Sequence, residues 1–287
     1  MDTCHALSKF LGRRKGQLTF DSGDPIDILN KAGVSFTINP YGRKLAEEEL
    51  ELLIPEYDVV IAGTEPITGS VLKKAKRLKM ISRVGIGLDS VDLLEARRRG
   101  ISISYTPEAP SPAVAELTIG LMLSLLRKVH LSNVRMRSGE WQRYFGSRLA
   151  NSVVGIIGVG RIGTRVLTHL AGFECDQILV NDIIEKKLDN YGRAIEWCDK
   201  EFIYREADVI SLHLPLTIET ENLIGVNQLE LMKPGAVLIN TSRGGIINET
   251  DLYEVMQRGH LSGAAIDVFT NEPYSGPLTE IERCILT

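Results

Sequence analysis

Three glycines in the middle of the chain have the spacing of a phosphate-binding turn. Gly158, Gly160 and Gly163 follow the apolar run VVGII and form the pattern GxGxxG. In such a turn the first glycine permits a sharp bend, the second lets the backbone approach a pyrophosphate, and the third lets the next helix pack closely on the strand. The first amides of that helix then face the phosphates. The pattern predicts a dinucleotide site, although the spacing alone is weak evidence.

An acidic residue downstream strengthens this prediction. The run QILVND ends in Asp182, about 20 residues after the glycines, where the dinucleotide pattern places a ribose ligand. A carboxylate there can accept hydrogen bonds from both ribose hydroxyls and would repel the additional phosphate of NADP. Ile183 and Ile184 add no cation, so we favour NAD over NADP. The cations Lys186 and Lys187 leave the use of NADP open. An alternative role for Asp182 is to cap a loop.

The elements around these residues alternate between helix and strand. In the first part of the chain we expect strands at VSFTIN, YDVVIAG, KMISRVG and ISISYT, with helices between them. The proline-rich segment TPEAPSP then leads into an apolar helix over 113–128. Five further β-branched runs follow: NSVVGIIG, QILVND, ADVISLHL, AVLINTS and GAAIDVF. We therefore predict an α/β fold with two doubly wound parallel sheets, in domains 1–104 and 105–287.

The composition excludes several classes of protein. The 287 residues suffice for two domains, and the 44% hydrophobic content is that of an ordinary soluble chain. A net charge of −4 supplies no basic field for nucleic acid. The four cysteines are too far apart for a disulfide framework or a metal cluster, and no apolar run is long enough to span a bilayer. We expect a cytoplasmic protein without a metal, a membrane anchor or a nucleic-acid partner.

With these motifs in view, the chain resembles the D-isomer-specific 2-hydroxyacid dehydrogenases, and is most similar to their phosphoglycerate dehydrogenase branch. The resemblance runs through blocks in the order GTEPITGSVL, ISRVGIGLDSVDL, VAELTIGLML, GEWQR, GIIGVGRIG, SLHLPLT, INTSRGGIINETDL and GAAIDVFTNEP. It implies a flavodoxin-like substrate domain, then a Rossmann NAD-binding domain, with the reaction in the cleft between them. The implied reaction is an oxidoreductase step that moves a hydride between NAD(H) and C2 of a small 2-hydroxy or 2-keto acid.

The resemblance also assigns residues to the reaction. Arg243 in TSRGG would bind the substrate, because a guanidinium can engage a planar carboxylate while polarising the neighbouring carbonyl. Glu272 would pair with a catalytic histidine and raise its pKa. Val84 and Gly85 would contribute backbone amides to the substrate carboxylate.

Further residues are implied on the cofactor side. Asp267 would bind the nicotinamide carboxamide, with a buried cap as the alternative role. The remaining residues that the resemblance places at the nucleotide are Arg161, Ile162, His213, Pro215 and Thr241.

Two features depart from the family pattern. Glu108 and Pro110 stand where the family usually has a glycine and an asparagine, which leaves the identity of the acid open. The family's general acid is a histidine in a Pro-His pair, and its expected position lies beyond Thr287. His213 is a poor substitute, because its family counterpart lines the nucleotide. We therefore expect the chain to be a C-terminally shortened form with weak or no activity.

Other interpretations remain at this point. The same fold could serve an NAD(H)-sensing binding protein or co-regulator, although such a protein has no need for the clamp that Arg243 and Glu272 would form. A non-functional fragment is a further alternative. The resemblance also implies a homodimer, formed through the 113–128 helix and the RMRSGEWQR segment.

Overall fold

A computed structural model describes residues 5–8, 25–188 and 195–287, which divide into two compact units, 1–110 and 111–287. The sequence predicted this boundary after residue 104. Hydrogen bonds explain why the following turn groups with the first unit: the Thr106 amide donates to the carbonyl of Gly85 at 3.1 Å, and the Gly85 amide donates to Thr106 Oγ1 at 2.8 Å. Glu108 and Pro110 lie in the turn that follows.

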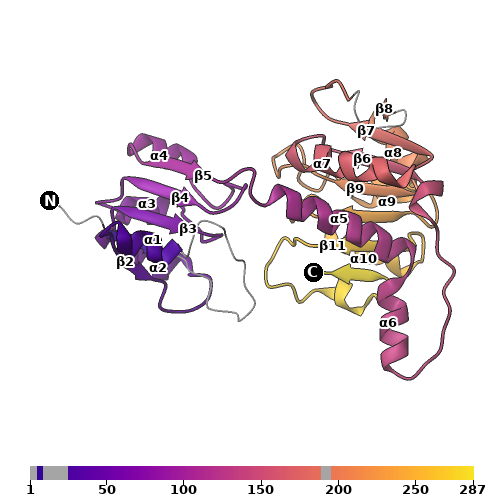
Figure 1. The fold of residues 1–287 in the computed structure, drawn as a ribbon, viewed down its shortest axis with the longest axis horizontal. Coiled ribbons are helices and arrows are strands. Elements are labelled where there is room, and N and C mark those ends of the chain that lie inside the picture. The colour runs from indigo at the N-terminus through magenta and orange to yellow at the C-terminus, as the bar shows by residue number, and fades with distance from the viewer. Residues whose placement is uncertain (1–4, 9–24, 189–194) are drawn as a thin grey trace. The chain divides into compact units, whose positions relative to one another are not determined.

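The first unit is a five-stranded parallel sheet with strand order β2-β1-β3-β4-β5, the order of flavodoxin-like folds (Figure 1). Its core is formed by buried side chains that include Leu50, Val71 and Ile81. The strands are β1 His5–Ser8, β2 Ser35–Ile38, β3 Val59–Ala62, β4 Met80–Arg83 and β5 Ser102–Tyr105, and the helices are α1 Pro25–Lys31, α2 Glu47–Leu53, α3 Gly69–Lys74 and α4 Leu93–Arg98. Strand β1 was not predicted from the sequence.

The second unit begins with two helices, α5 Ser111–Leu126 and α6 Val129–Arg137. The sequence predicted one helix reaching residue 128. The helix is interrupted because Lys128 adopts a left-handed backbone conformation with φ of 54°, which a continuous helix does not allow.

The sheet of the second unit has seven parallel strands in the order β12-β11-β10-β9-β6-β7-β8, the doubly wound order of dinucleotide-binding folds. The chain order reverses between β6 and β9, which is where such folds bind ligands. The strands are β6 Val153–Ile157, β7 Gln177–Asn181, β8 Ile195–Trp197, β9 Val209–Leu212, β10 Val237–Asn240, β11 Gly263–Ile266 and β12 Cys284–Leu286, and the further helices are α7 Arg161–Leu170, α8 Lys200–Glu206, α9 Val226–Leu231 and α10 Glu249–Gln257.

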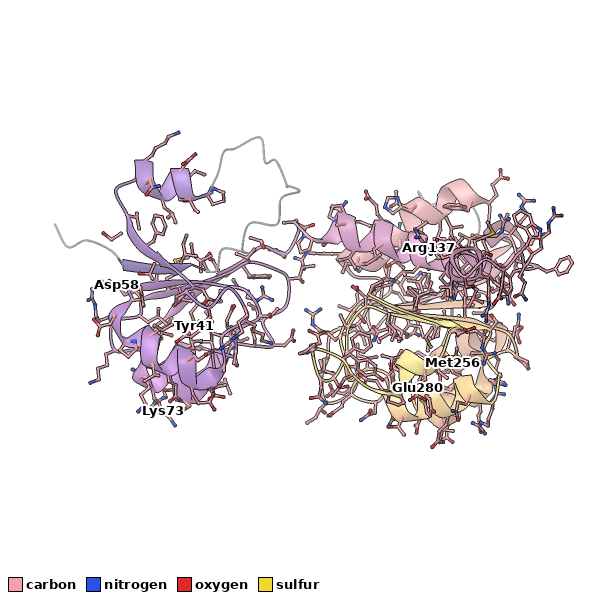
Figure 2. The ribbon with its side chains drawn as sticks, turned by 90° about the horizontal axis from the view of Figure 1, so that it is seen from below. Tyr41, Asp58, Lys73, Arg137, Met256 and Glu280 are labelled. Atoms are coloured by element: carbon pink, nitrogen blue, oxygen red, sulfur yellow. The ribbon has the colours of Figure 1, made fainter. Side chains whose placement is uncertain are left out.

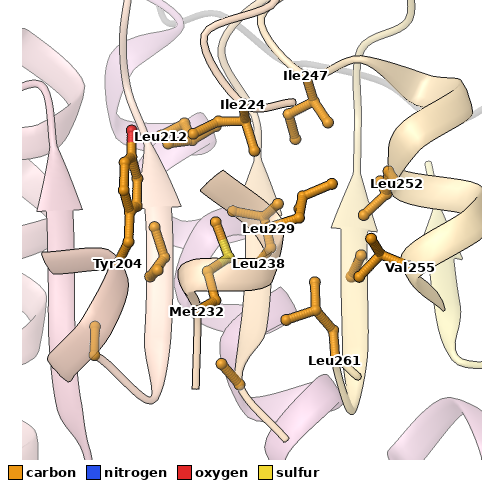
Figure 3. Close-up of a cluster of buried hydrophobic side chains, with 14 of the residues drawn as sticks. Tyr204, Leu212, Ile224, Leu229, Met232, Leu238, Ile247, Leu252, Val255 and Leu261 are labelled. Carbon is orange, nitrogen blue, oxygen red and sulfur yellow. The ribbon is translucent and has the colours of Figure 1, made fainter. Parts of the chain in front are cut away.

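Helices cover both faces of this sheet. Helices α5 and α7 pack with one buried cluster, whereas α8, α9 and α10 pack with the other. Figure 2 shows Met256 of α10 and Arg137 of α6 on opposite sides of the sheet. Figure 3 shows the second cluster, in which Leu238 of β10 lies among side chains from α8, α9 and α10. Strands β9, β10 and β11 are buried at every residue, as expected for parallel strands covered on both faces. The predicted α/β fold with two parallel sheets is confirmed.

Candidate functional site

The glycine-rich turn joins β6 to α7 at the reversal point of the second sheet. Gly158 has φ of 97°, and a Cβ there would overlap the carbonyl of His213. A Cβ on Gly163 would overlap the carbonyl oxygen of Gly158, so the turn closes only with glycines at both positions. By contrast, a Cβ on Gly160 would meet nothing within 4 Å. The open space beside Gly160 at a helix N-terminus is suited to a diphosphate.

Arg161 and Ile162 are the first two residues of α7, directly after this open space. Their position at the helix N-terminus places them where the amides of the first turn have no intrahelical acceptors. The structure thus groups both predicted residues with the glycine-rich turn.

Asp182 lies at the end of β7 and is tied to the same turn. Its Oδ2 accepts a hydrogen bond from the amide of Val159 at 2.7 Å, and its Oδ1 accepts one from the amide of Ile184 at 3.1 Å. Each carboxylate oxygen has a second lone pair. Asp182 therefore caps its own loop and still retains acceptor capacity for ribose hydroxyls, so the two alternatives considered from the sequence are compatible.

His213 follows β9, and its backbone carbonyl lies against Gly158 of the glycine-rich turn. Its Nε2 lies 3.0 Å from Ser211 Oγ, while its buried Nδ1 has no hydrogen-bond partner in the described part of the chain. Burial lowers the pKa of His213 to about 4, so the ring is neutral at neutral pH. An unsatisfied buried nitrogen beside the glycine-rich turn fits a site that takes a polar ligand. Pro215 continues this loop and is exposed.

The turn after β10 carries Arg243, and Asn240 fixes its shape. The Asn240 side chain accepts hydrogen bonds from the amide of Ser242 at 3.1 Å and from Ser242 Oγ at 2.7 Å, and it donates to the carbonyl of Arg243 at 2.9 Å. Asn240 is 2% exposed, so these bonds form out of water. The neighbouring Thr241 is also buried and lies 2.9 Å from Thr118 Oγ1 of α5. The Arg243 backbone is therefore held rigidly at the end of a buried strand.

The Arg243 turn touches the loop that carries Glu272. A Cβ on Gly244 would overlap the carbonyl of Phe269, so the two backbones lie in direct contact. Glu272 is exposed, and its Oε1 accepts a hydrogen bond from the amide of Phe269 at 3.2 Å. The close contact at Gly244 thus fixes the turn of Arg243 against the loop of Glu272.

Asp267 connects these segments to β12. Its amide donates to the carbonyl of Asn240 at 3.0 Å, and its Oδ1 accepts a hydrogen bond from Thr287 Oγ1 at 2.7 Å. The residues predicted at the cofactor, together with Arg243 and Glu272, therefore follow the carboxyl ends of β6, β7, β9, β10 and β11, which share one edge of a parallel sheet.

Val84 and Gly85 belong to the first unit, after β4. The Val84 amide donates to the carbonyl of Ala62 at 2.8 Å, and the Gly85 amide donates to Thr106 Oγ1. Both amides thus already have acceptors within their own unit, which the sequence did not predict. The buried Arg83 guanidinium lies over Gly85 and donates to the Val84 carbonyl.

Sequence reasoning missed Asn240 and Gly244 as residues that shape the site. Both belong to the quoted block INTSRGG, so the motif contained the signal. Only the hydrogen bonds and the backbone contact distinguish them from their neighbours. Within the described ranges no cluster of three or more histidine, cysteine or acidic residues could hold a metal ion, and no helix has the length and apolar character of a membrane span.

Known proteins resemble the chain over most of its length. The family model "D-isomer specific 2-hydroxyacid dehydrogenase, NAD binding domain" matches residues 119–287. A hydroxypyruvate reductase of Thermotoga maritima is 36% identical over 92% of this chain and 86% of its own length. A D-3-phosphoglycerate dehydrogenase of Methanocaldococcus jannaschii is 38% identical over 92% of this chain, which spans 50% of that relative.

A solved structure agrees with these sequence matches. The D-lactate dehydrogenase of Aquifex aeolicus, complexed with NAD and lactic acid, has a TM-score of 0.82 and 26% identity, and the match covers 99% of this chain and 87% of that one. The second unit is thus an NAD-binding domain, with the glycine-rich turn at the reversal point of its sheet. The chain belongs to the D-isomer-specific 2-hydroxyacid dehydrogenase family.

Proposed function

We propose that this chain is an NAD-dependent dehydrogenase that transfers a hydride between NAD(H) and C2 of a small 2-hydroxy or 2-keto acid. The observation that carries the proposal is the contact at Gly244, which holds the Arg243 turn against the Glu272 loop. Both segments lie on the same sheet edge as the glycine-rich turn. Hydroxypyruvate, glyoxylate and 3-phosphohydroxypyruvate are the acids to test first, because relatives of this chain include hydroxypyruvate and glyoxylate reductases and phosphoglycerate dehydrogenases.

Each residue has a separate role in this proposal. Gly158, Gly160 and Gly163 admit the diphosphate, Asp182 holds the ribose hydroxyls, and Asp267 orients the nicotinamide amide. When bound, NADH supplies the hydride. Arg243 engages the carboxylate of the acid and polarises its C2 carbonyl, since a guanidinium presents paired donors to adjacent oxygens. The remaining residues proposed to line the nucleotide are Arg161, Ile162, His213, Pro215 and Thr241.

Val84 and Gly85 would contribute the shape of their backbone to the substrate site, and not hydrogen bonds. Their amides have internal acceptors, so we propose that they line the substrate by close approach of the backbone. Glu272 would stabilise the protonated form of the catalytic histidine that the family resemblance implies. That histidine donates a proton to the new alkoxide at C2.

His213 is unsuited to that proton transfer, because a group with a pKa of about 4 carries no proton to release as imidazolium at neutral pH. His260 precedes β11 and its Nε2 lies 2.9 Å from the Met232 carbonyl oxygen, and His169 is in the last turn of α7. Both therefore lie toward the amino-terminal edge of the sheet, away from Arg243. We propose that none of these three histidines is the general acid of the reaction, a group that contributes about 10²–10⁴-fold where it is positioned at the substrate.

We also propose that the chain forms a homodimer through α6 and the segment that follows it. Residues 127–148 contain six cations and one carboxylate, a net +5, so the rest of this −4 chain carries −9. The same segment exposes 53% of Val129, 75% of Trp141 and 98% of Phe145. Exposed apolar side chains are typical of binding surfaces, and the cations around them would be attracted to the acidic remainder of a second copy.

Gly160→Val should strongly weaken NADH binding without unfolding the chain. A Cβ at this position meets nothing within 4 Å, so the new side chain fills the space proposed for the diphosphate. We expect the dissociation constant for NADH, measured by fluorescence titration, to rise at least tenfold, with the melting temperature unchanged. Gly172→Val is the matched control, because a Cβ at Gly172 also meets nothing within 4 Å. Equal NADH affinity in both variants would contradict the proposed site.

Arg243→Lys should retain NADH affinity and lose affinity for the acid. A lysine keeps the charge but cannot present two donors in a fixed plane. We expect the KM for the preferred 2-keto acid to rise at least tenfold and turnover to fall. Arg258→Lys, an exposed arginine paired with Glu230, is the control. If Arg243→Lys matched the control, Arg243 would have no role in holding the acid.

Phe145→Asp should convert a dimer to a monomer. Light scattering should give about twice the 31.8 kDa chain mass for the unmodified protein and the chain mass for the variant. Ile218→Asp, at a residue that is 88% exposed outside this segment, should remain dimeric. A monomeric unmodified chain would rule out the proposed interface.

A further inference from the structure

We propose that the ribose end of the nucleotide site also accepts a 2′-phosphate, held by Lys186, so that the chain binds NADPH as well as NADH. This inference rests on the proposed role of Asp182 at the ribose.

The first observation is the position of the Lys186 ammonium. Lys186 Nζ donates a hydrogen bond to the carbonyl of Val159 at 2.7 Å, while the amide of the same Val159 donates to Asp182 Oδ2 at 2.7 Å. Val159 lies between Gly158 and Gly160. The cation and the carboxylate are therefore both anchored on one residue of the glycine-rich turn, although Lys186 follows Asp182 on an exposed loop.

The second observation concerns how strongly the Asp182 carboxylate repels a 2′-phosphate. Both of its carboxylate oxygens already accept backbone amide hydrogens, from Val159 and Ile184. Donors directed at a carboxylate offset part of its negative charge, so the repulsion that Asp182 exerts on a second anion is reduced. Its free lone pairs still serve ribose hydroxyls, which explains why NADH binding need not suffer.

The chemistry of the two groups completes the argument. A lysine ammonium has three donor hydrogens, and the Val159 carbonyl takes one, which leaves two for another acceptor. A phosphate monoester carries about −1.5 to −2 charges at pH 7 and three acceptor oxygens. A cation fixed beside the ribose ligand is the feature by which dinucleotide folds accommodate a 2′-phosphate.

The exposed residues next to Lys186 define its control. Ile183 and Ile184 are apolar and 97% and 64% exposed, so they neither attract nor repel the phosphate. Lys187 has the same charge as Lys186 and is likewise exposed, but among the described hydrogen bonds only Lys186 reaches the glycine-rich turn. Lys187→Ala therefore removes the same charge without removing the anchored ammonium.

The test compares ligands that differ only in the 2′-phosphate. Calorimetric titrations should use NADH against NADPH, and adenosine 5′-monophosphate against adenosine 2′,5′-bisphosphate, on the full chain, Lys186→Ala and Lys187→Ala. We expect measurable NADPH binding by the full chain. Lys186→Ala should weaken both 2′-phosphorylated ligands about tenfold relative to their partners, as for one lost charge-assisted bond. Lys187→Ala should change these ratios less than twofold.

Loss of the bond from Lys186 to Val159 could loosen the turn and weaken all ligands. Such a general effect cancels in the ratio of the affinities for the two ligands of each pair. NADH binding without detectable NADPH binding in the full chain would overturn this inference and leave the proposed function intact. The same holds if the Lys186→Ala and Lys187→Ala ratios are equal. Failure of NADH and adenosine 5′-monophosphate to bind at all would overturn the proposed function together with this inference.

Discussion

The close contact between the backbones at Gly158, Gly163 and His213 is the constraint on which the nucleotide-binding edge depends. A side chain at either glycine would overlap a carbonyl, so only hydrogen atoms allow β6, α7 and the segment after β9 to meet. Because the strands are parallel, their carboxyl ends then share one edge, and each connecting loop starts beside the others. Asp182 ties the β7 loop to this turn through the Val159 amide.

A second backbone contact governs the acid-binding side of the same edge. Asn240 uses its side chain to shape the Arg243 turn and its carbonyl to hold the Asp267 amide. Gly244 then lets that turn rest on the Glu272 loop. The catalytic roles proposed for Arg243 and Glu272 thus depend on a buried asparagine and a glycine that take no part in the chemistry themselves. Support from neighbouring residues is expected where charged functional groups must be held in a fixed position.

The sequence could predict those features that follow from local pattern. Apolar runs gave the parallel strands, and glycine spacing gave the turn, because both reflect short-range steric requirements. Strand β1 was missed because four residues, HALS, carry little of the alternation or β-branching that marks a strand. The break at Lys128 was missed because no glycine or proline marks it. The acceptors of the Val84 and Gly85 amides lie in β3, at Ala62, and directly after β5, at Thr106, so they cannot be identified from the 84–85 segment alone.

Hydride transfer itself is the claim that separates a dehydrogenase from a protein that only binds NAD(H). The most direct measurement is incubation of the full chain with NADH deuterated at C4 and each of hydroxypyruvate, glyoxylate and 3-phosphohydroxypyruvate. Mass spectrometry of the products over hours detects even slow turnover. Our account predicts deuterium at C2 of at least one 2-hydroxy acid product, and less of it with Arg243→Lys. Tight NADH binding with no labelled product from any of the three acids would contradict the account and favour a binding-only role.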